Sequence, residues 1–246
     1  MNTEAEIRDI FDHLKKLIMI NEEMHIDLPP IPSEALNYLE DGVPAYRDKK
    51  KGADTLTSLE ALRAFIGDCQ RCKLHRGRNN LVFGEGSPHA KLVFVGEGPG
   101  REEDIIGRPF VGDAGKLLTK IIKNGMGLTR EEVYICNVVK CRPPGNRDPE
   151  NDEIETCLPF LKQQLGIIKP EVICILGRIA GQALLGGDFK ITHKRGVWHS
   201  YMDIPVMPTY HPAYIIRNPS RERELKGQVW EDIKKIMKHL GLPQSP

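Results

Sequence analysis

The sequence predicts an α/β fold, in which a central four-stranded parallel sheet is flanked by helices on both faces. Two observations lead to this prediction. Four short apolar runs typical of buried strands alternate with segments of helical apolar spacing, and that alternation implies parallel strands with helices on both sides. The length of 246 residues and the charged fraction of 28% are those of a globular protein with one sizeable core and an appendage.

The first part of the chain differs in character from the rest. Residues 5–18 have helical apolar spacing, and a proline-rich stretch at 28–32 and a charged stretch at 47–52 follow them. We therefore predict a helical extension and linker over residues 1–57 and the main domain over residues 58–246. The pattern is compatible with an appended helix and with a docking module, whose protein partner would be unknown.

The elements of the main domain follow one another regularly. A helix over residues 59–69 leads to a Cys-x2-Cys turn, and the closing helix spans residues 222–240. Between them we predict strands at 92–95, 133–139, 172–176 and 206–210, and helices at 114–126, 152–165 and 179–185. Ligands bind at the carboxyl ends of parallel strands, so the loops after the four strands should form the site.

Four cysteines have the spacing of a metal centre. Cys69 and Cys72 form a CxxC pair, and Cys141 and Cys157 follow at a distance. A thiolate tetrad of this kind holds zinc or an iron-sulfur cluster, and the spacing does not distinguish the two. We interpret the other two cysteines, Cys136 and Cys174, as small buried hydrophobic residues.

Several sequence features indicate the cellular compartment of the protein. No apolar run approaches the roughly 20 residues that span a bilayer, and the acidic N-terminus is unlike a signal peptide. We therefore expect a cytoplasmic protein without a membrane partner. In a reducing compartment the four cysteines predict metal ligation rather than disulfides.

Polar residues follow three of the predicted strands. Glu97, Asn137 and His211 lie at strand ends that should meet at one edge of the sheet. An asparagine amide suits the edge of a nucleobase, and a histidine can donate to a carbonyl oxygen or stabilise a developing anion. The Gly-Glu-Gly-Pro-Gly turn at 96–100 lacks the spacing of a dinucleotide fingerprint or a P-loop, but it permits close backbone approach to a ligand.

Motifs along the main domain resemble those of the family 4 uracil-DNA glycosylases. The matching segments are 96–100, 102–104, 107–112, 137–144 and 211–214, and the four cysteines fall where that family holds its cluster. The resemblance covers residues 58 to about 241. It implies the three-layer sandwich of that family, a four-iron, four-sulfur cluster, and a monofunctional enzyme that hydrolyses the N-glycosidic bond of uracil in DNA. We expect the protein to be a monomer. The products would be free uracil and an abasic site.

The resemblance also assigns roles to individual residues. Phe110 would stack on the flipped uracil, Asn137 would pair with its N3–H and O4, and His211 would bond O2 and stabilise the uracil anion. The family's best-known members orient the attacking water with an aspartate at the position of Gly98, so here the adjacent Glu97 is the candidate for that role. Backbone groups of Gly96, Glu97 and Gly98 would complete the pocket. Glu103 and Asn146 would form a hydrogen-bonded pair that braces the pocket near C5 of the base.

Several basic residues near these motifs could grip the DNA. The near-neutral net charge of +1 neither requires nor excludes such a partner, and an ordinary solvated surface is the alternative for each residue. Tyr214, Ile215 or Ile216 could wedge into the space left by the extruded base. The predicted DNA contacts are Lys140, Arg142, Arg147, Lys194, Arg195, Tyr214 and Arg217.

Three other functions compete with this interpretation. An iron-sulfur relative could capture uracil-DNA covalently through a histidine of the loop after the third strand, where His193 and His199 lie. A non-catalytic DNA-binding or polymerase-associated module would release no uracil. An α/β hydrolase is disfavoured because the sequence has no Gly-x-Ser-x-Gly elbow.

Overall fold

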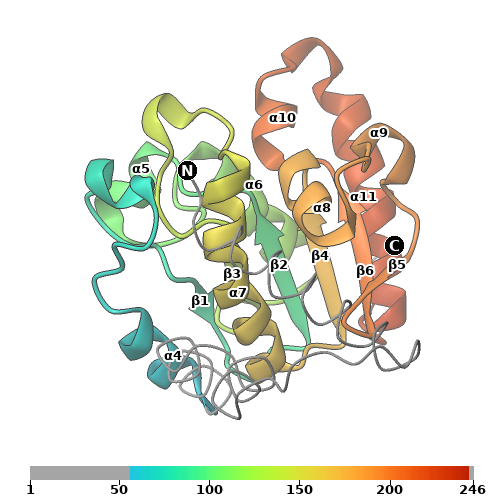
Figure 1. Cartoon of the computed structure of the whole chain (residues 1–246). Coiled ribbons are helices and arrows are strands. Elements are labelled where there is room, and N and C mark those ends of the chain that lie inside the picture. The colour runs from blue at the N-terminus through green and yellow to red at the C-terminus, as the bar shows by residue number, and fades with distance from the viewer. Residues whose placement is uncertain (1–55, 244–246) are drawn as a thin grey trace, which may run out of the picture. The chain divides into compact units, whose positions relative to one another are not determined.

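The computed structural model describes residues 56–243, and its centre is a six-stranded sheet of order β1-β3-β2-β4-β6-β5 (Figure 1). The four inner strands are parallel, which confirms the predicted core. They are β2 (Leu92–Gly96), β3 (Tyr134–Asn137), β4 (Val172–Leu176) and β6 (Ile204–Thr209). Two short antiparallel strands at the edges, β1 (Glu85–Gly86) and β5 (His199–Tyr201), were not predicted. The predicted helix at 5–18 and its linker lie outside the described residues, so the domain boundary stays a prediction.

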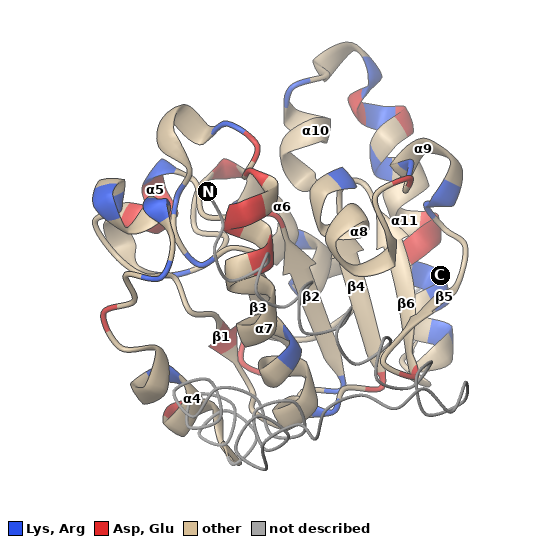
Figure 2. Cartoon of the chain, in the orientation of Figure 1, with Lys and Arg blue, Asp and Glu red and all other residues tan. Residues whose placement is uncertain are grey.

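The inner strands carry no charged residue, as Figure 2 shows, because both of their faces are covered. In β2 the side chains of Val93 and Val95 enter one hydrophobic cluster, and those of Leu92 and Phe94 enter the other. The alternation follows from the two-residue period of a strand. A continuous apolar run is therefore the expected signature of each inner strand.

Different helices cover the two faces of the sheet. One cluster receives side chains from α4 (Leu59–Ile66), α7 (Asn151–Ile168) and α8 (Arg178–Leu185). The other receives them from α6 (Asp113–Lys120), the π-helical η2 (Ile121–Gly125), α10 (Pro212–Ile216) and α11 (Glu222–His239). No helix within residues 56–243 is long and apolar enough to cross a membrane.

Local chemistry sets several of the helix ends. The Ser58 hydroxyl accepts a hydrogen bond from the Ala61 amide at 3.1 Å and begins α4, while Gly67, at φ +54°, ends it before the predicted residue 69. The predicted helix at 114–126 divides into α6 and η2. Short elements that the apolar spacing did not reveal are α5 (Arg101–Ile106), α9 (Ile191–Lys194), α10, η1 (Lys73–Gly77), η3 (Pro144–Asn146) and η4 (Pro219–Arg221).

Candidate active site

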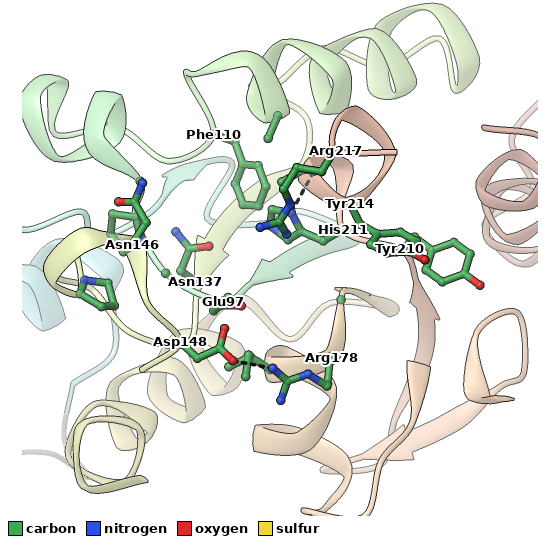
Figure 3. A pocket seen from close by; sticks show the side chains of 18 of the residues that line it. Glu97, Phe110, Asn137, Asn146, Asp148, Arg178, Tyr210, His211, Tyr214 and Arg217 are labelled. Atoms are coloured by element: carbon green, nitrogen blue, oxygen red, sulfur yellow. Dashed lines mark hydrogen bonds and ion pairs between the residues drawn. The ribbon is translucent and has the colours of Figure 1, made fainter. Parts of the chain in front are cut away.

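A cavity of about 460 Å³ opens at the carboxyl ends of the parallel strands (Figure 3). Its lining comes from the loops after all four inner strands, as expected for this type of sheet. The structure brings most of the predicted pocket residues to this one cavity, together with three predicted DNA contacts. They are Glu97, Gly98, Glu103, Phe110, Asn137, Asn146, Arg147, His211, Tyr214 and Arg217.

Asn137 is the last residue of β3 and presents its amide to the cavity. The register of the sheet places it beside Gly96. A Cβ on Gly96 would lie 2.4 Å from Asn137 Oδ1 and 2.5 Å from Phe110 Cζ, so only glycine permits this approach. Asn137 is 1% exposed, and its Oδ1 has no hydrogen-bond partner among the described residues. A buried acceptor in this state is suited to a ligand donor.

Phe110 is also buried, and its ring lies near that of His211. The two ring centroids are 5.5 Å apart with an interplanar angle of 32°. The backbone of Phe110 has φ +52°, an outlier for a bulky residue. The loop is braced by Glu103, whose Oε1 accepts from the amides of Val111 at 2.9 Å and Gly112 at 3.0 Å.

Glu103 does not make the hydrogen bond to Asn146 that we expected. Its second carboxylate oxygen, Oε2, accepts from the Gly100 amide at 3.1 Å. The side chain of Asn146 turns instead to Arg142, whose Nε donates to Asn146 Oδ1 at 2.7 Å. Both residues line the cavity, but Glu103 acts on the backbone of the two loops that flank it.

His211 is the N-cap residue that directly precedes α10. Its Nδ1 accepts a hydrogen bond from the Ala213 amide at 3.1 Å, so in the neutral ring the proton is on Nε2. Burial, with a smaller contribution from Arg217, lowers the pKa of His211 to about 4. At neutral pH the side chain is therefore an uncharged imidazole that can donate from Nε2.

Glu97 lies half-buried on the floor of the cavity near Asp148 (Figure 3). Burial first, and then the negative charge of Asp148, raise the pKa of Glu97 to about 7, while Arg178 and Arg217 oppose that shift. Arg178 and Asp148 form an ion pair at 2.5 Å. A carboxylate whose charge changes near neutral pH can accept a proton or a hydrogen bond from water.

Sequence reasoning missed Asp148 and Arg178. Arg178 directly follows Gly177, the residue after β4, and that position at a strand end was a usable signal. Asp148 lies in a loop, where the sequence alone predicts that a charged residue is exposed to solvent. Only the fold brings it beside Glu97.

The predicted DNA contact of Lys140 is wrong. Lys140 is 1% exposed, and its Nζ donates to the Asn137 carbonyl at 2.7 Å and to Gln164 Oε1 at 2.6 Å, so it cannot reach a phosphate. Arg195 is also turned inward. Its guanidinium binds Asp232 at 2.7 Å, and the side chain is only 18% exposed.

The remaining basic candidates lie nearer to solvent. Arg217 and Lys194 are exposed, while Arg142 and Arg147 are partly exposed. The three candidate wedge residues differ in how exposed their side chains are. Tyr214 packs against Tyr210, Ile215 is 1% exposed, and Ile216 is 45% exposed. Ile216 is therefore the side chain with a free apolar surface.

The four cysteines of the predicted metal centre line one small cavity between α4 and α7. Three of the sulfurs receive N–H donors: Arg71 Nη1 to Cys69 at 3.3 Å, Arg78 Nη1 to Cys141 at 3.2 Å, and the Lys140 amide to Cys157 at 3.3 Å. Such donors stabilise thiolates. The other two cysteines lie elsewhere, Cys136 in β3 and Cys174 in β4, each buried in the core.

The cysteine arrangement bears on what could be bound. Within residues 56–243, no three His, Cys, Asp or Glu side chains are close enough together to hold a single metal ion. Four thiolates lining one cavity are a donor set that suits zinc as well as an iron-sulfur cluster. Burial raises the pKa of the Cys157 thiol to about 12, and a bound metal would supply the charge that keeps it a thiolate.

Comparisons with known proteins agree with this geometry. The family model of the uracil DNA glycosylase superfamily matches residues 83–234. A type-4 uracil-DNA glycosylase of Sulfurisphaera tokodaii is 49% identical over 74% of this chain and 84% of its own length. Those of Saccharolobus solfataricus and Thermotoga maritima are 44% and 48% identical, over 76% and 72% of this chain and 88% and 92% of their own lengths. The chain belongs to the uracil DNA glycosylase superfamily and, within it, to the type-4 uracil-DNA glycosylases.

Proposed function

We propose that this protein removes uracil from DNA by hydrolysing the N-glycosidic bond, releasing uracil and leaving an abasic site. The observation that carries the proposal is the convergence of Glu97, Phe110, Asn137 and His211, from four separate segments, on one cavity. Each side chain offers a different group to a flipped base. The target base must leave the stack to reach such a cavity.

Recognition of the base follows from two side chains. The Oδ1 of Asn137, which has no partner within residues 56–243, can accept the N3–H of uracil, and its Nδ2 can donate to O4. Cytosine presents a donor in place of O4 and an acceptor in place of N3–H, so the same amide rejects it. The ring of Phe110 would stack on the base and exclude water from its face.

Bond cleavage places negative charge on the departing uracil. The Nε2–H of neutral His211 can donate a hydrogen bond to O2, and that hydrogen bond becomes stronger as negative charge develops on the uracil. The carboxylate of Glu97 would orient the attacking water by accepting a hydrogen bond from it. Because the pKa of Glu97 is raised to about 7, that carboxylate is available at and above neutral pH.

We propose a four-iron, four-sulfur cluster on Cys69, Cys72, Cys141 and Cys157. The shared cavity and the N–H donors to three of the sulfurs support this assignment. A cluster there would join the turn after α4 to α7 and to the loop after β3. Glycosidic hydrolysis transfers no electron, so its contribution is structural.

DNA would approach the rim of the cavity. The candidate phosphate contacts are the partly or fully exposed Arg142, Arg147, Lys194 and Arg217, of which Arg147 also binds Glu153, and Arg178 at the cavity wall adds a further cation. Ile216, at the end of α10, is the candidate wedge for the gap that the flipped nucleotide leaves. Lys140 and Arg195 are not part of this surface.

One assay tests the proposal and its alternatives together. Purified protein is incubated with single- and double-stranded oligonucleotides that contain one uracil, and the products are cleaved with alkali and resolved on a gel. We expect strand cleavage at the uracil, free uracil, and many turnovers. A gel-stable protein–DNA complex without turnover would indicate covalent capture, and binding without uracil release would indicate a non-catalytic module.

A further inference from the structure

Phe110 has a backbone conformation that its residue type disfavours. Its φ of +52° lies in the left-handed region, where a bulky side chain is a genuine outlier. Such residues persist only where the surrounding structure holds them, and they concentrate at functional sites. The strain is local to the loop that positions the ring at the cavity (Figure 3).

Arg130 contacts the backbone of this residue directly. It lies in the turn that precedes β3, twenty positions after Phe110 in sequence. Its Nη1 donates to the Phe110 carbonyl at 3.1 Å, and its Nη2 donates to the Pro109 carbonyl at 2.7 Å. Nη1 also donates to Thr119 Oγ1 at 2.8 Å. The planar guanidinium thus joins two successive carbonyls of the loop to α6.

Glu85 holds Arg130 from the other side. The carboxylate of Glu85 accepts from Arg130 Nε at 2.9 Å and also from Nη2, so all five N–H donors of Arg130 are used. Glu85 belongs to β1, which pairs with β3 through Ile135. The Glu85 and Arg130 side chains are 19% and 14% exposed, so solvent screens this pair little.

Two further contacts constrain the backbone on either side of the Phe110 carbonyl. A Cβ on Gly115 would lie 1.9 Å from the Phe110 carbonyl oxygen, so α6 packs directly against that group. On the other side of the residue, Glu103 accepts from the amides of Val111 and Gly112. Arg130 therefore holds the carbonyl side, and Glu103 holds the amides that follow.

We infer that Arg130, held by Glu85, is a positioning residue that keeps Phe110 in its left-handed conformation and so holds the stacking ring in the base pocket. This inference rests on the proposed function for its effect on catalysis. Displacement of a positioning group by about 1 Å can cost about 100-fold in rate. Arg130 itself does not line the cavity, so its effect on the base would pass through Phe110.

Arg108 provides a matched control. It also binds Glu85, with its Nε at 2.7 Å from Oε2, but it is 58% exposed and donates to neither carbonyl of the loop. Arg108→Met therefore removes a cation from the same carboxylate without releasing Phe110. Arg130→Met removes every bond to the loop, and Arg130→Lys keeps the charge but loses the planar fork.

The experiment measures single-turnover uracil excision at saturating protein for five forms: wild type, Arg108→Met, Arg130→Met, Phe110→Ala and the Phe110→Ala/Arg130→Met double variant. We expect Arg130→Met to lose about 100-fold and Arg108→Met to match the wild type. In the Phe110→Ala background, Arg130→Met should cost no more than about twofold, because the ring that it positions is gone. Losses that multiply in the double variant would overturn the inference, as would a normal rate for Arg130→Met.

A second readout does not depend on activity. Amide hydrogen exchange of Val111 and Gly112 should accelerate in Arg130→Met and stay unchanged in Arg108→Met. Unchanged exchange in both variants would contradict the inference. If Arg130→Met does not fold, Arg130→Lys and Glu85→Gln take its place in both measurements, with the same expected directions. A wild type that releases no uracil would overturn the proposed function and leave the exchange test intact.

Discussion

Asn137 holds its amide at the end of β3, and its Oδ1 accepts no hydrogen bond from the part of the chain that the structure describes, so its replacement tests base recognition directly. Asn137→Asp puts an acceptor opposite the O4 of uracil in a buried site, and we expect a loss of roughly 2 kcal/mol of transition-state binding. Weak excision of cytosine could appear, because its amino group is a donor. Single-turnover rates on uracil and cytosine duplexes check this.

The control for that variant is Asn124→Asp, an equivalent change at an exposed position in η2 that does not line the active-site cavity. It should leave both rates unchanged. Normal uracil excision by Asn137→Asp would show that the pocket reads the base through another group.

Glu97 should make the rate depend on pH near neutrality. Its pKa is raised to about 7, and we expect the carboxylate form to hold the water, so the single-turnover rate should rise as pH increases through about 7. Glu97→Gln should lower the rate and remove this rise. Protonation of His211 should not interfere, since its pKa of about 4 keeps it neutral in this range.

Two neighbours of Glu97 should shift that pH profile in opposite directions. Asp148 raises the pKa of Glu97, so Asp148→Asn should move the rise to lower pH. Arg178 lowers that pKa, so Arg178→Gln should move the rise to higher pH. A profile that neither variant shifts would mean that Glu97 is not the titrating group.

The four cysteines that line the small cavity come from the turn after α4, the loop after β3 and α7. Cys157→Ser should lose iron, lose the visible absorbance of an iron-sulfur protein, and lower the thermal unfolding temperature. Cys174→Ser changes a buried cysteine of β4 that lies outside this cavity, and it should keep its iron. Iron and sulfide analysis with thermal unfolding checks both variants. Zinc in place of iron in the wild type would overturn the cluster assignment.

The inner strands and long helices could be predicted because their signals are local. Each inner strand is a short apolar run, and α7 and α11 each extend over 18 residues of periodic sequence. The edge strands β1 and β5 have two and three residues, too few for any period to appear. Short helices such as α5 and α10 depend on tertiary packing and caps rather than on propensity.

Different residues of the molecule should determine its affinity for DNA and its rate of bond cleavage. Arg142→Ala and Arg217→Ala should weaken DNA binding, and each should reduce the slope of log K against log salt by about 1. Single-turnover rates at saturating protein should change little when they are measured well above pH 7, where Glu97 is ionised with or without Arg217. Lys238→Ala, at the opposite end of α11 from α10, is the control and should leave the slope unchanged.

His211→Ala should give the reverse pattern. Its imidazole acts on charge that appears only as the bond breaks, so the single-turnover rate should fall far more than the affinity for DNA. Binding titrations at two salt concentrations beside single-turnover assays check this. Equal losses of rate and affinity would mean that His211 holds the flipped nucleotide in both states.

The sequence by itself determined the parallel sheet, the cysteine set and the strand-end residues that meet in the cavity. Those features follow from apolar period, residue type and the rule that ligands bind at carboxyl strand ends. Only the tertiary structure decided which charges face solvent and which are held inside. Lys140 looked like a phosphate contact but lies buried against Gln164, and Arg130 gave no signal because its partners, Glu85 and Phe110, are distant in sequence. Burial and pairing depend on contacts between remote segments, and no local pattern records them.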